Sequence, residues 1–141
     1  MSKKHNIEDE LNRTGRLLQT TVGDSMEPML KNRQNIVVLE KTDGILRKYD
    51  LPLYRRPNGK YVLHRIIKVR KHDYIICGDN RWKKEKVPHE WILACVSGYY
   101  KNGRLISVDN PEYRKYLKTL GIRRKKLFFK AVIKKIKRII S

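Results

Sequence analysis

Short apolar and β-branched runs separated by polar turns dominate the middle of the chain, and this pattern predicts β-strands. Residues 35–40 form such a run, with a polar residue at each end, as a buried strand would have. Two Asn-Gly pairs, at 58–59 and 102–103, accept the positive φ angles of tight hairpin turns. The middle of the chain is therefore expected to be mainly antiparallel β. Further strands are predicted at residues 50–55, 61–69, 73–77, 92–101 and 104–108.

A short helix is predicted before these strands, over residues 7–18. Ile7, Leu11 and Leu18 would lie near one face of this helix, as the apolar side of a surface helix does.

A second helix is predicted directly after the last strand. Asn110 is a good N-cap residue, and Pro111 suits the first helical turn, where its missing N–H costs nothing. We therefore expect a helix over residues 112–120, with Gly121 as its stop.

The last predicted element, residues 123–140, combines apolar and basic residues at helical spacing. The apolar positions lie near one face, and this pattern is typical of an amphipathic basic helix on an anionic membrane. Two other interpretations stay open. In the first, the helix docks its apolar face on its own domain or on a partner, and its basic face is solvated. In the second, the basic residues contact nucleic acid. The apolar positions are Leu127, Phe128, Val132, Ile133, Ile136, Ile139 and Ile140.

Length and composition favour a single globular domain with a strongly basic end. The 141 residues suffice for one hydrophobic core, and 40% of them are hydrophobic despite a formal net charge of +20. Twelve basic residues and one acidic residue occur from position 112 onward. The predicted organisation is an N-terminal segment (1–20), a β-rich domain (21–108) and C-terminal helices with the basic tail (109–141).

The sequence predicts neither export nor a membrane span. The longest run without a charged residue, 91–100, has ten residues, whereas a spanning helix needs about 20. The first ten residues become acidic where a secretory signal would be apolar. Cys77 and Cys95 are too few for a disulfide framework and favour a reducing compartment. A cytoplasmic protein is expected.

Ser25 is the first candidate for chemistry. It follows Gly23 in a bend after a short predicted strand, where a hydroxyl can be exposed and backbone N–H groups can face a developing oxyanion. A serine also occurs in many turns that have no chemistry.

His64 is the base that such a serine would need. A serine hydroxyl is a weak nucleophile near neutral pH unless a base lies within hydrogen-bond reach. Strand alternation would send His64 and Arg65 to opposite faces, so the imidazole can face a cleft. Lys60 and Lys68 are rival bases, about 13 Å along the strand from His64.

Three short motifs occur in order at residues 23–28, 62–66 and 77–80. Residues 23–28 (Gly-Asp-Ser-Met-Glu-Pro) resemble the Gly-x-Ser-Met-x-Pro motif of the type I signal peptidases and the related self-cleaving repressor peptidases, in which this serine is the nucleophile. Residues 62–66 (Val-Leu-His-Arg-Ile) resemble the His-Arg motif of the endoplasmic reticulum, archaeal and some sporulating-bacterial members, in which histidine replaces the catalytic lysine. Residues 77–80 (Cys-Gly-Asp-Asn) resemble the downstream Gly-Asp-Asn motif. The resemblance implies a signal-peptidase-like antiparallel β fold and a Ser-His peptidase.

Asp79 is the candidate for a third catalytic residue in this resemblance. It would orient His64 or stabilise its imidazolium, and the alternative is that it only shapes a turn. Eukaryotic-type members carry a further acidic pair beyond this motif, whereas residues 81–86 hold only Glu85.

The resemblance also implies how a substrate would bind. An extended peptide would add alongside the strand near residues 20–23, with contacts from Thr21, Val22, Gly23 and Met26. Members that serve secretion carry a membrane anchor before the serine, whereas the 24 residues that precede Ser25 are mostly polar. Bulk signal-peptide removal is therefore not expected.

A metal centre is not expected. Cys77, Cys95, His72 and His89 match no tight Cys-x-x-Cys or His-x-x-x-His spacing. The aromatic residues Trp82, Trp91, Tyr99 and Tyr100 are expected to pack the domain or line its cleft.

The expected function is a serine endopeptidase that needs no cofactor and cleaves a leader or precursor peptide. It would act in the cytoplasm, peripherally at an anionic membrane through its tail. The alternative is a non-catalytic basic protein that binds nucleic acid or an acidic partner on a peptidase-derived scaffold. No DNA-reading module is recognisable, so specific nucleic-acid binding is not expected.

Overall fold

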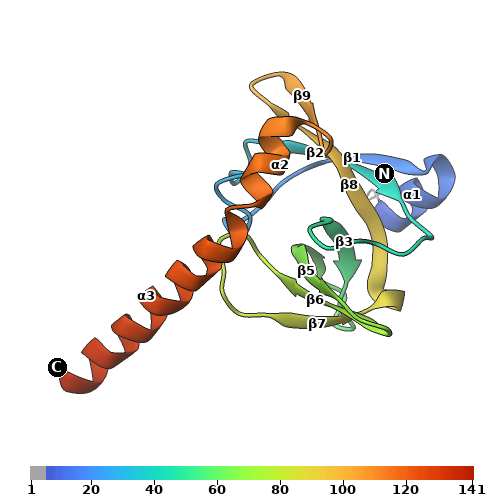
Figure 1. The fold of residues 1–141 in the computed structure, drawn as a ribbon. Helices are drawn as coiled ribbons and strands as arrows, with labels where there is room; N and C mark the ends of the chain where they lie inside the picture. Colours follow the sequence, from blue (N-terminus) through green and yellow to red (C-terminus); the bar gives the residue numbers. More distant parts are fainter. Residues whose placement is uncertain (1–5) are drawn as a thin grey trace, which may run out of the picture.

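The computed structural model describes residues 6–141 and has the mainly β architecture that the sequence predicts (Figure 1). Antiparallel strands occupy the middle of the chain, and helices lie at its ends. The elements in chain order are α1 (Ile7–Thr14), β1 (Arg16–Thr20), β2 (Ile36–Lys41), β3 (Pro52–Arg55), β4 (Tyr61–Leu63), β5 (Arg65–Val69), β6 (Asp73–Cys77), β7 (Glu85–Pro88), a 3-10 turn (His89–Trp91), β8 (Ile92–Lys101), β9 (Arg104–Ser107), α2 (Pro111–Leu117) and α3 (Leu120–Ile140).

The larger sheet has the strand order β1-β2-β8-β3-β4, and β9 pairs with β8. The long strand β8 lies between β2 and β3, and Figure 1 shows how it curves. Register shifts at Val38/Leu39 and Leu53/Tyr54 interrupt the regular pairing, and such irregularities bend strands. The sheet therefore curls into a half-barrel in which β1 and β4 are the outer strands.

The strand predicted at residues 61–69 is divided in the structure, which corrects that prediction. β4 pairs with β3 in the larger sheet, whereas β5 pairs with β6 in a smaller sheet of order β5-β6-β7. The β3–β4 ladder stops beside Pro52, which has no N–H to continue it. The chain changes sheets at His64, so the imidazole stands at the junction of the two sheets.

The N-terminal helix is shorter than predicted. It ends at Thr14 because Gly15 adopts a left-handed conformation, with φ of +76°, and donates its N–H to the Leu11 carbonyl at 2.8 Å. Residues 16–20, which were expected to be partly helical, form β1 and pair with β2.

The C-terminal helices also begin and end at other residues than predicted. α2 ends at Leu117, where the Thr119 hydroxyl donates to the Tyr116 carbonyl at 2.7 Å. Gly121 lies in the first turn of α3 and stops no helix. The predicted tail helix is therefore confirmed but begins at Leu120.

The main hydrophobic core lies inside the curl of the larger sheet. Leu11 of α1 and Tyr113 of α2 are buried there against residues of β2 and β8. Met26 and Met29, which follow Ser25, belong to the same core. The loop that carries the serine is therefore attached to the core by its own apolar side chains.

Candidate active site

Ser25 and His64 lie within hydrogen-bond distance of each other. The Ser25 Oγ and His64 Nε2 atoms are 3.0 Å apart, although the residues are separated by 39 positions. Ser25 comes from the loop between β1 and β2, and His64 from the junction of β4 and β5. The structure thus brings together a hydroxyl and the base that could activate it.

Local backbone geometry shapes the serine loop. Gly23 has φ of +93°, a conformation that favours glycine, and donates its N–H to Asn32 Oδ1 at 2.8 Å. Asp24 forms an ion pair of 2.6 Å with Arg81, and the Ser25 carbonyl accepts the Asn80 N–H at 2.8 Å. Contacts from the loop after β6 therefore hold Ser25 in place.

Gly78 is a site residue to which the sequence motif assigned no role. A Cβ atom added at this position would lie 2.7 Å from the Ser25 carbonyl oxygen and 3.3 Å from His64 Nε2. Such distances mean that any side chain would displace the serine loop. The glycine lets the backbone after β6 pack directly against the Ser-His pair.

The surroundings of His64 favour its neutral form. Burial lowers the pKa of the imidazole below its ordinary value of 6.5, and the positive charge of Arg56 lowers it further. The Glu85 and Asp79 carboxylates act in the opposite direction but do not reverse the shift. At neutral pH the ring can therefore accept a proton from Ser25.

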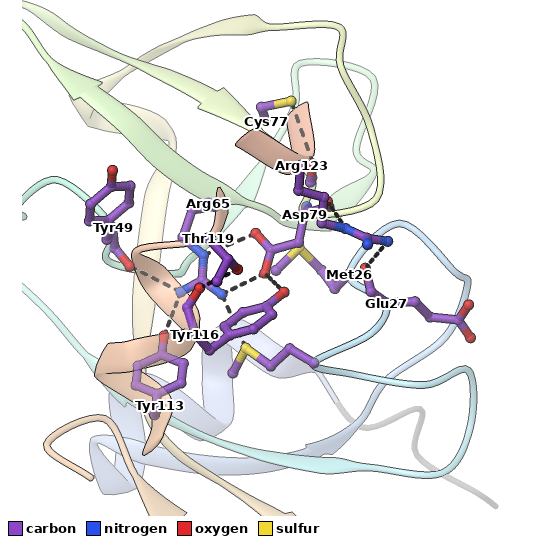
Figure 2. A network of polar contacts seen from close by, with 12 residues as sticks. Met26, Glu27, Tyr49, Arg65, Cys77, Asp79, Tyr113, Tyr116, Thr119 and Arg123 are labelled. Atoms are coloured by element: carbon purple, nitrogen blue, oxygen red, sulfur yellow. Dashed lines mark hydrogen bonds and ion pairs between the residues drawn. The ribbon is translucent and has the colours of Figure 1, made fainter. Parts of the chain in front are cut away.

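The structure places the Asp79 carboxylate on a buried arginine and a tyrosine (Figure 2). Arg65 donates to its two oxygens at 3.1 and 2.8 Å, and the Tyr116 hydroxyl donates at 2.8 Å. No hydrogen bond joins Asp79 to His64, although both lie in the part of the chain that the structure describes. Asp79 therefore affects the pKa of the imidazole only through its charge. Its hydrogen bonds hold the loop after β6 against Arg65 and α2.

Arg65 is the centre of this buried network. Its side chain is completely buried and also donates to the Tyr49 carbonyl at 3.0 Å and to the Tyr113 hydroxyl. Burial alone would lower the pKa of Arg65, but the Asp79 carboxylate outweighs this effect and keeps the guanidinium charged. The opposite faces predicted for His64 and Arg65 are seen: the imidazole faces Ser25, and the guanidinium faces α2.

Arg123 links helix α3 to both loops of the site. Its Nε atom donates to the Asp79 carbonyl at 3.1 Å, and its Nη2 atom donates to Asn80 Oδ1 at 2.9 Å and to the Glu27 carbonyl at 3.5 Å. Figure 2 shows this side chain between Asp79 and Glu27. No local pattern in the sequence singles out Arg123, because it is one arginine among many basic residues in the tail.

A cavity of about 390 Å³ opens beside the Ser-His pair. Residues 19–23 line one side and residues 60–64 the other, so the outer strands β1 and β4 flank it. Its floor is apolar. Thr21, Val22, Gly23 and Met26, the predicted substrate-contact residues, all line the cavity.

The rival bases lie elsewhere. Lys60 lines the outer part of the cavity and Lys68 is exposed on β5, whereas His64 occupies the position beside Ser25. The acidic residue Glu85 is engaged by Arg56 and by the Tyr54 hydroxyl, at 2.9 and 2.6 Å. Glu85 thus influences His64 only by charge.

The cysteines form no disulfide and no metal group. Cys77 and Cys95 are free, and burial raises the pKa of Cys95 to about 11, so its thiol stays protonated. Within residues 6–141 no cluster of His, Cys, Asp and Glu could hold a metal ion.

No protein-family model matches the chain, and no curated protein matches it. In residues 6–141, no helix has both the length and the apolar character needed to cross a membrane.

Proposed function

We propose that this chain is a serine endopeptidase in which Ser25 is the nucleophile and His64 the general base. The observation that carries the proposal is the 3.0 Å contact between Ser25 Oγ and His64 Nε2 beside a cavity. The three motifs at residues 23–28, 62–66 and 77–80 resemble those of signal-peptidase-like enzymes, and this resemblance supports a peptide bond as the substrate.

The geometry supports acyl transfer in two steps. Ser25 Oγ attacks the peptide carbonyl while His64 Nε2 takes the hydroxyl proton, and the carbonyl π electrons move to the oxygen. The tetrahedral intermediate then collapses, the C–N bond breaks, and His64 gives the proton to the leaving amine. Water, deprotonated by His64, hydrolyses the acyl-enzyme and regenerates the Ser25 hydroxyl.

The Ser25 N–H can stabilise the oxyanion. Within the described residues this amide has no hydrogen-bond acceptor, so it is free to donate to a substrate oxygen. A backbone donor that is already aimed at the developing charge lowers the barrier without reorganisation.

A substrate would bind as an extended strand between β1 and β4. Both strands are outer strands of the half-barrel, so each has backbone groups that a peptide could pair with. The apolar floor beneath them, which includes Leu30, Leu39 and Leu53, suits small or apolar side chains of a leader or precursor peptide.

Asp79 is a positioning residue in this proposal. It holds Arg65 and Tyr116 and so keeps the loop of Gly78 against the Ser-His pair. Its negative charge also raises the pKa of His64. This effect is smaller than those of burial, Arg56, Glu85 and Arg81 on the same pKa. Asp79 can thus stabilise the His64 imidazolium by its charge, whereas no hydrogen bond within residues 6–141 lets it orient the ring.

The proposal includes a place of action, which is the cytoplasm at a membrane surface. Free Cys77 and Cys95 fit a reducing compartment. The basic helix α3 is the part of the chain that suits a membrane surface, and it extends away from the cavity-bearing domain in Figure 1.

A peptide-library digest tests the peptidase. The wild-type protein should cleave a subset of the library, whereas Ser25→Ala and His64→Ala should each lower the rate by roughly 1,000-fold or more, because members of one catalytic unit fail together. His72→Ala and Ser107→Ala are controls, since both side chains are exposed and lie outside the cavity.

Two results would contradict the proposal. A folded His64→Ala variant with undiminished turnover would exclude His64 as the base. A wild-type protein that cleaves nothing, yet binds nucleic acid in a salt-dependent manner that survives Ser25→Ala, would favour the non-catalytic basic protein.

A further inference from the structure

Helix α3 carries an exposed apolar surface over most of its length. These side chains are 44–78% exposed, which is unusual for Ile and Phe in one element. From Ile133 to Ile140 every residue is exposed. We call these apolar residues the α3 stripe: Ile122, Phe128, Phe129, Ile133, Ile136, Ile139 and Ile140.

The α3 stripe occupies one side of the helix. At about 100° per residue, its members fall within an arc of roughly 140°. Lys125 is the one basic residue of α3 whose position falls well inside this arc. The other basic residues occupy the remaining circumference, so the helix is divided into an apolar and a cationic side.

The domain covers only the first turns of α3. Leu120 is buried, Arg123 bonds the catalytic loops, and Phe128 packs edge-on against Trp82 with ring centroids 5.3 Å apart. Beyond these contacts the helix projects away from the sheets (Figure 1). The outer part of the α3 stripe therefore faces no other element of the described chain.

We propose that α3 is an in-plane anchor that inserts the α3 stripe into the surface of an anionic lipid bilayer. The helix has nine Lys and Arg residues and no Asp or Glu, so it matches the negative surface of such a membrane. An amphipathic helix with a broad apolar side and a cationic side lies at the level of the lipid headgroups.

The apolar side and the cationic side of α3 together favour a lipid bilayer over nucleic acid or a second copy of the chain. Nucleic acid would attract the cationic side but would leave seven large apolar side chains in water. A second copy of the chain would cover the α3 stripe but would bring nine like charges close to nine others. A bilayer with anionic lipid satisfies both sides at once.

This inference deepens the place of action at a membrane surface that the proposed function includes, and it does not depend on peptidase activity. Arg123 joins the base of α3 to the loops of Ser25 and Asp79. A membrane-bound α3 would consequently hold the cavity at a fixed place near the membrane, where peptides associated with the bilayer are concentrated.

Vesicle flotation of the full chain tests the anchor. We expect binding to phosphatidylcholine vesicles that contain roughly 30% phosphatidylglycerol, and weak binding to phosphatidylcholine alone. The triple variant Ile133→Ser, Ile136→Ser, Ile140→Ser should bind the anionic vesicles at least about 10-fold more weakly, because it loses the inserted apolar groups. All three side chains are exposed, so the domain should remain folded.

A matched variant controls for apolar content. Leu18→Ser, Ile45→Ser, Leu105→Ser removes three exposed apolar side chains from elsewhere and should bind within about 2-fold of the wild type. Ser25→Ala should bind like the wild type, which separates this test from that of the peptidase.

Three outcomes would overturn the anchor. The stripe variant could bind anionic vesicles as well as the wild type does. Binding could be abolished by salt and by added DNA yet be insensitive to the stripe variant, which would show a purely electrostatic contact. The wild type could form a dimer that the stripe variant does not form and fail to bind vesicles, which would make the α3 stripe an interface between copies.

Discussion

At the residue scale, the proposed role of His64 as the base determines the pH range in which the site would work. A lysine would have to be strongly desolvated to lose its proton near neutral pH, whereas histidine ordinarily titrates close to it. His64 is also partly buried and stands near Arg56, and both influences lower its pKa. The neutral ring therefore dominates near neutral pH.

Peptide cleavage should depend on pH with an acid limb below 6.5. Protonation of His64 removes the acceptor for the Ser25 proton, so the rate falls as the pH drops through the lowered pKa of His64. A pH profile of kcat/KM on a soluble peptide measures this midpoint. A midpoint near the ordinary pKa of a lysine would instead indicate that Lys60 or Lys68 is the base.

Arg56→Gln provides the matched variant for this profile. It removes a positive charge that lowers the pKa of His64 and leaves Glu85, whose charge raises it. The acid limb should therefore move to higher pH. An unchanged limb in an active variant would show that the titrating group is not His64.

At the element scale, a buried ion pair fastens the helices to the sheets. Arg65 begins β5, Asp79 follows β6, and Tyr113 and Tyr116 belong to α2. The Arg65 and Asp79 side chains are each 1% exposed. Removing one member of such a pair leaves the other as an uncompensated buried charge.

Asp79→Asn should therefore destabilise the protein by about 3–5 kcal/mol, as loss of one partner of a buried ion pair does. Urea unfolding measures this change in the free energy of unfolding. Asp109→Asn is the control, because its pair with Arg114 is exposed on both sides and should matter little. Equal stability of the Asp79→Asn protein and the wild type would show that the ion pair does not hold the elements together.

At the scale of the whole molecule, the half-barrel with the Ser-His pair and the basic helix α3 are joined at one helix turn. The cavity and the Ser-His pair belong to the half-barrel, whereas the densest positive charge lies in α3. Arg123 lies at the boundary and contacts both loops of the Ser-His site. Truncation beyond it should separate the two parts.

A chain that ends at Arg124 should still cleave a soluble peptide, because it keeps Arg123 and the whole cavity lining. It should lose binding to anionic vesicles, because most of the α3 stripe and the densest charge are absent. Cleavage and flotation assays on the same preparation check both statements. Equal vesicle binding by the full and the truncated chain would exclude α3 as the anchor.

Local patterns in the sequence were enough for the fold class and for most strands. The apolar run at 35–40 became β2, and the Asn102-Gly103 turn joins β8 to β9, since both depend on neighbouring residues alone. The amphipathic period of the tail likewise predicted α3. The sequence pattern did not predict the short strand β7. Residues Glu85–Pro88 are partly charged and show no strand pattern, and they form a strand only because they pair with β6.

Residue chemistry and motif resemblance singled out Ser25 and His64, but only the tertiary structure could bring them within 3.0 Å. The division of residues 61–69 at His64 depends on which neighbours each half can pair with, and no local pattern contains that information. The tertiary structure likewise determines which residues Asp79 contacts. Its carboxylate bonds Arg65 and Tyr116 because a buried guanidinium must be compensated by the nearest anion, and that proximity exists only once β5, the loop after β6 and α2 have packed together.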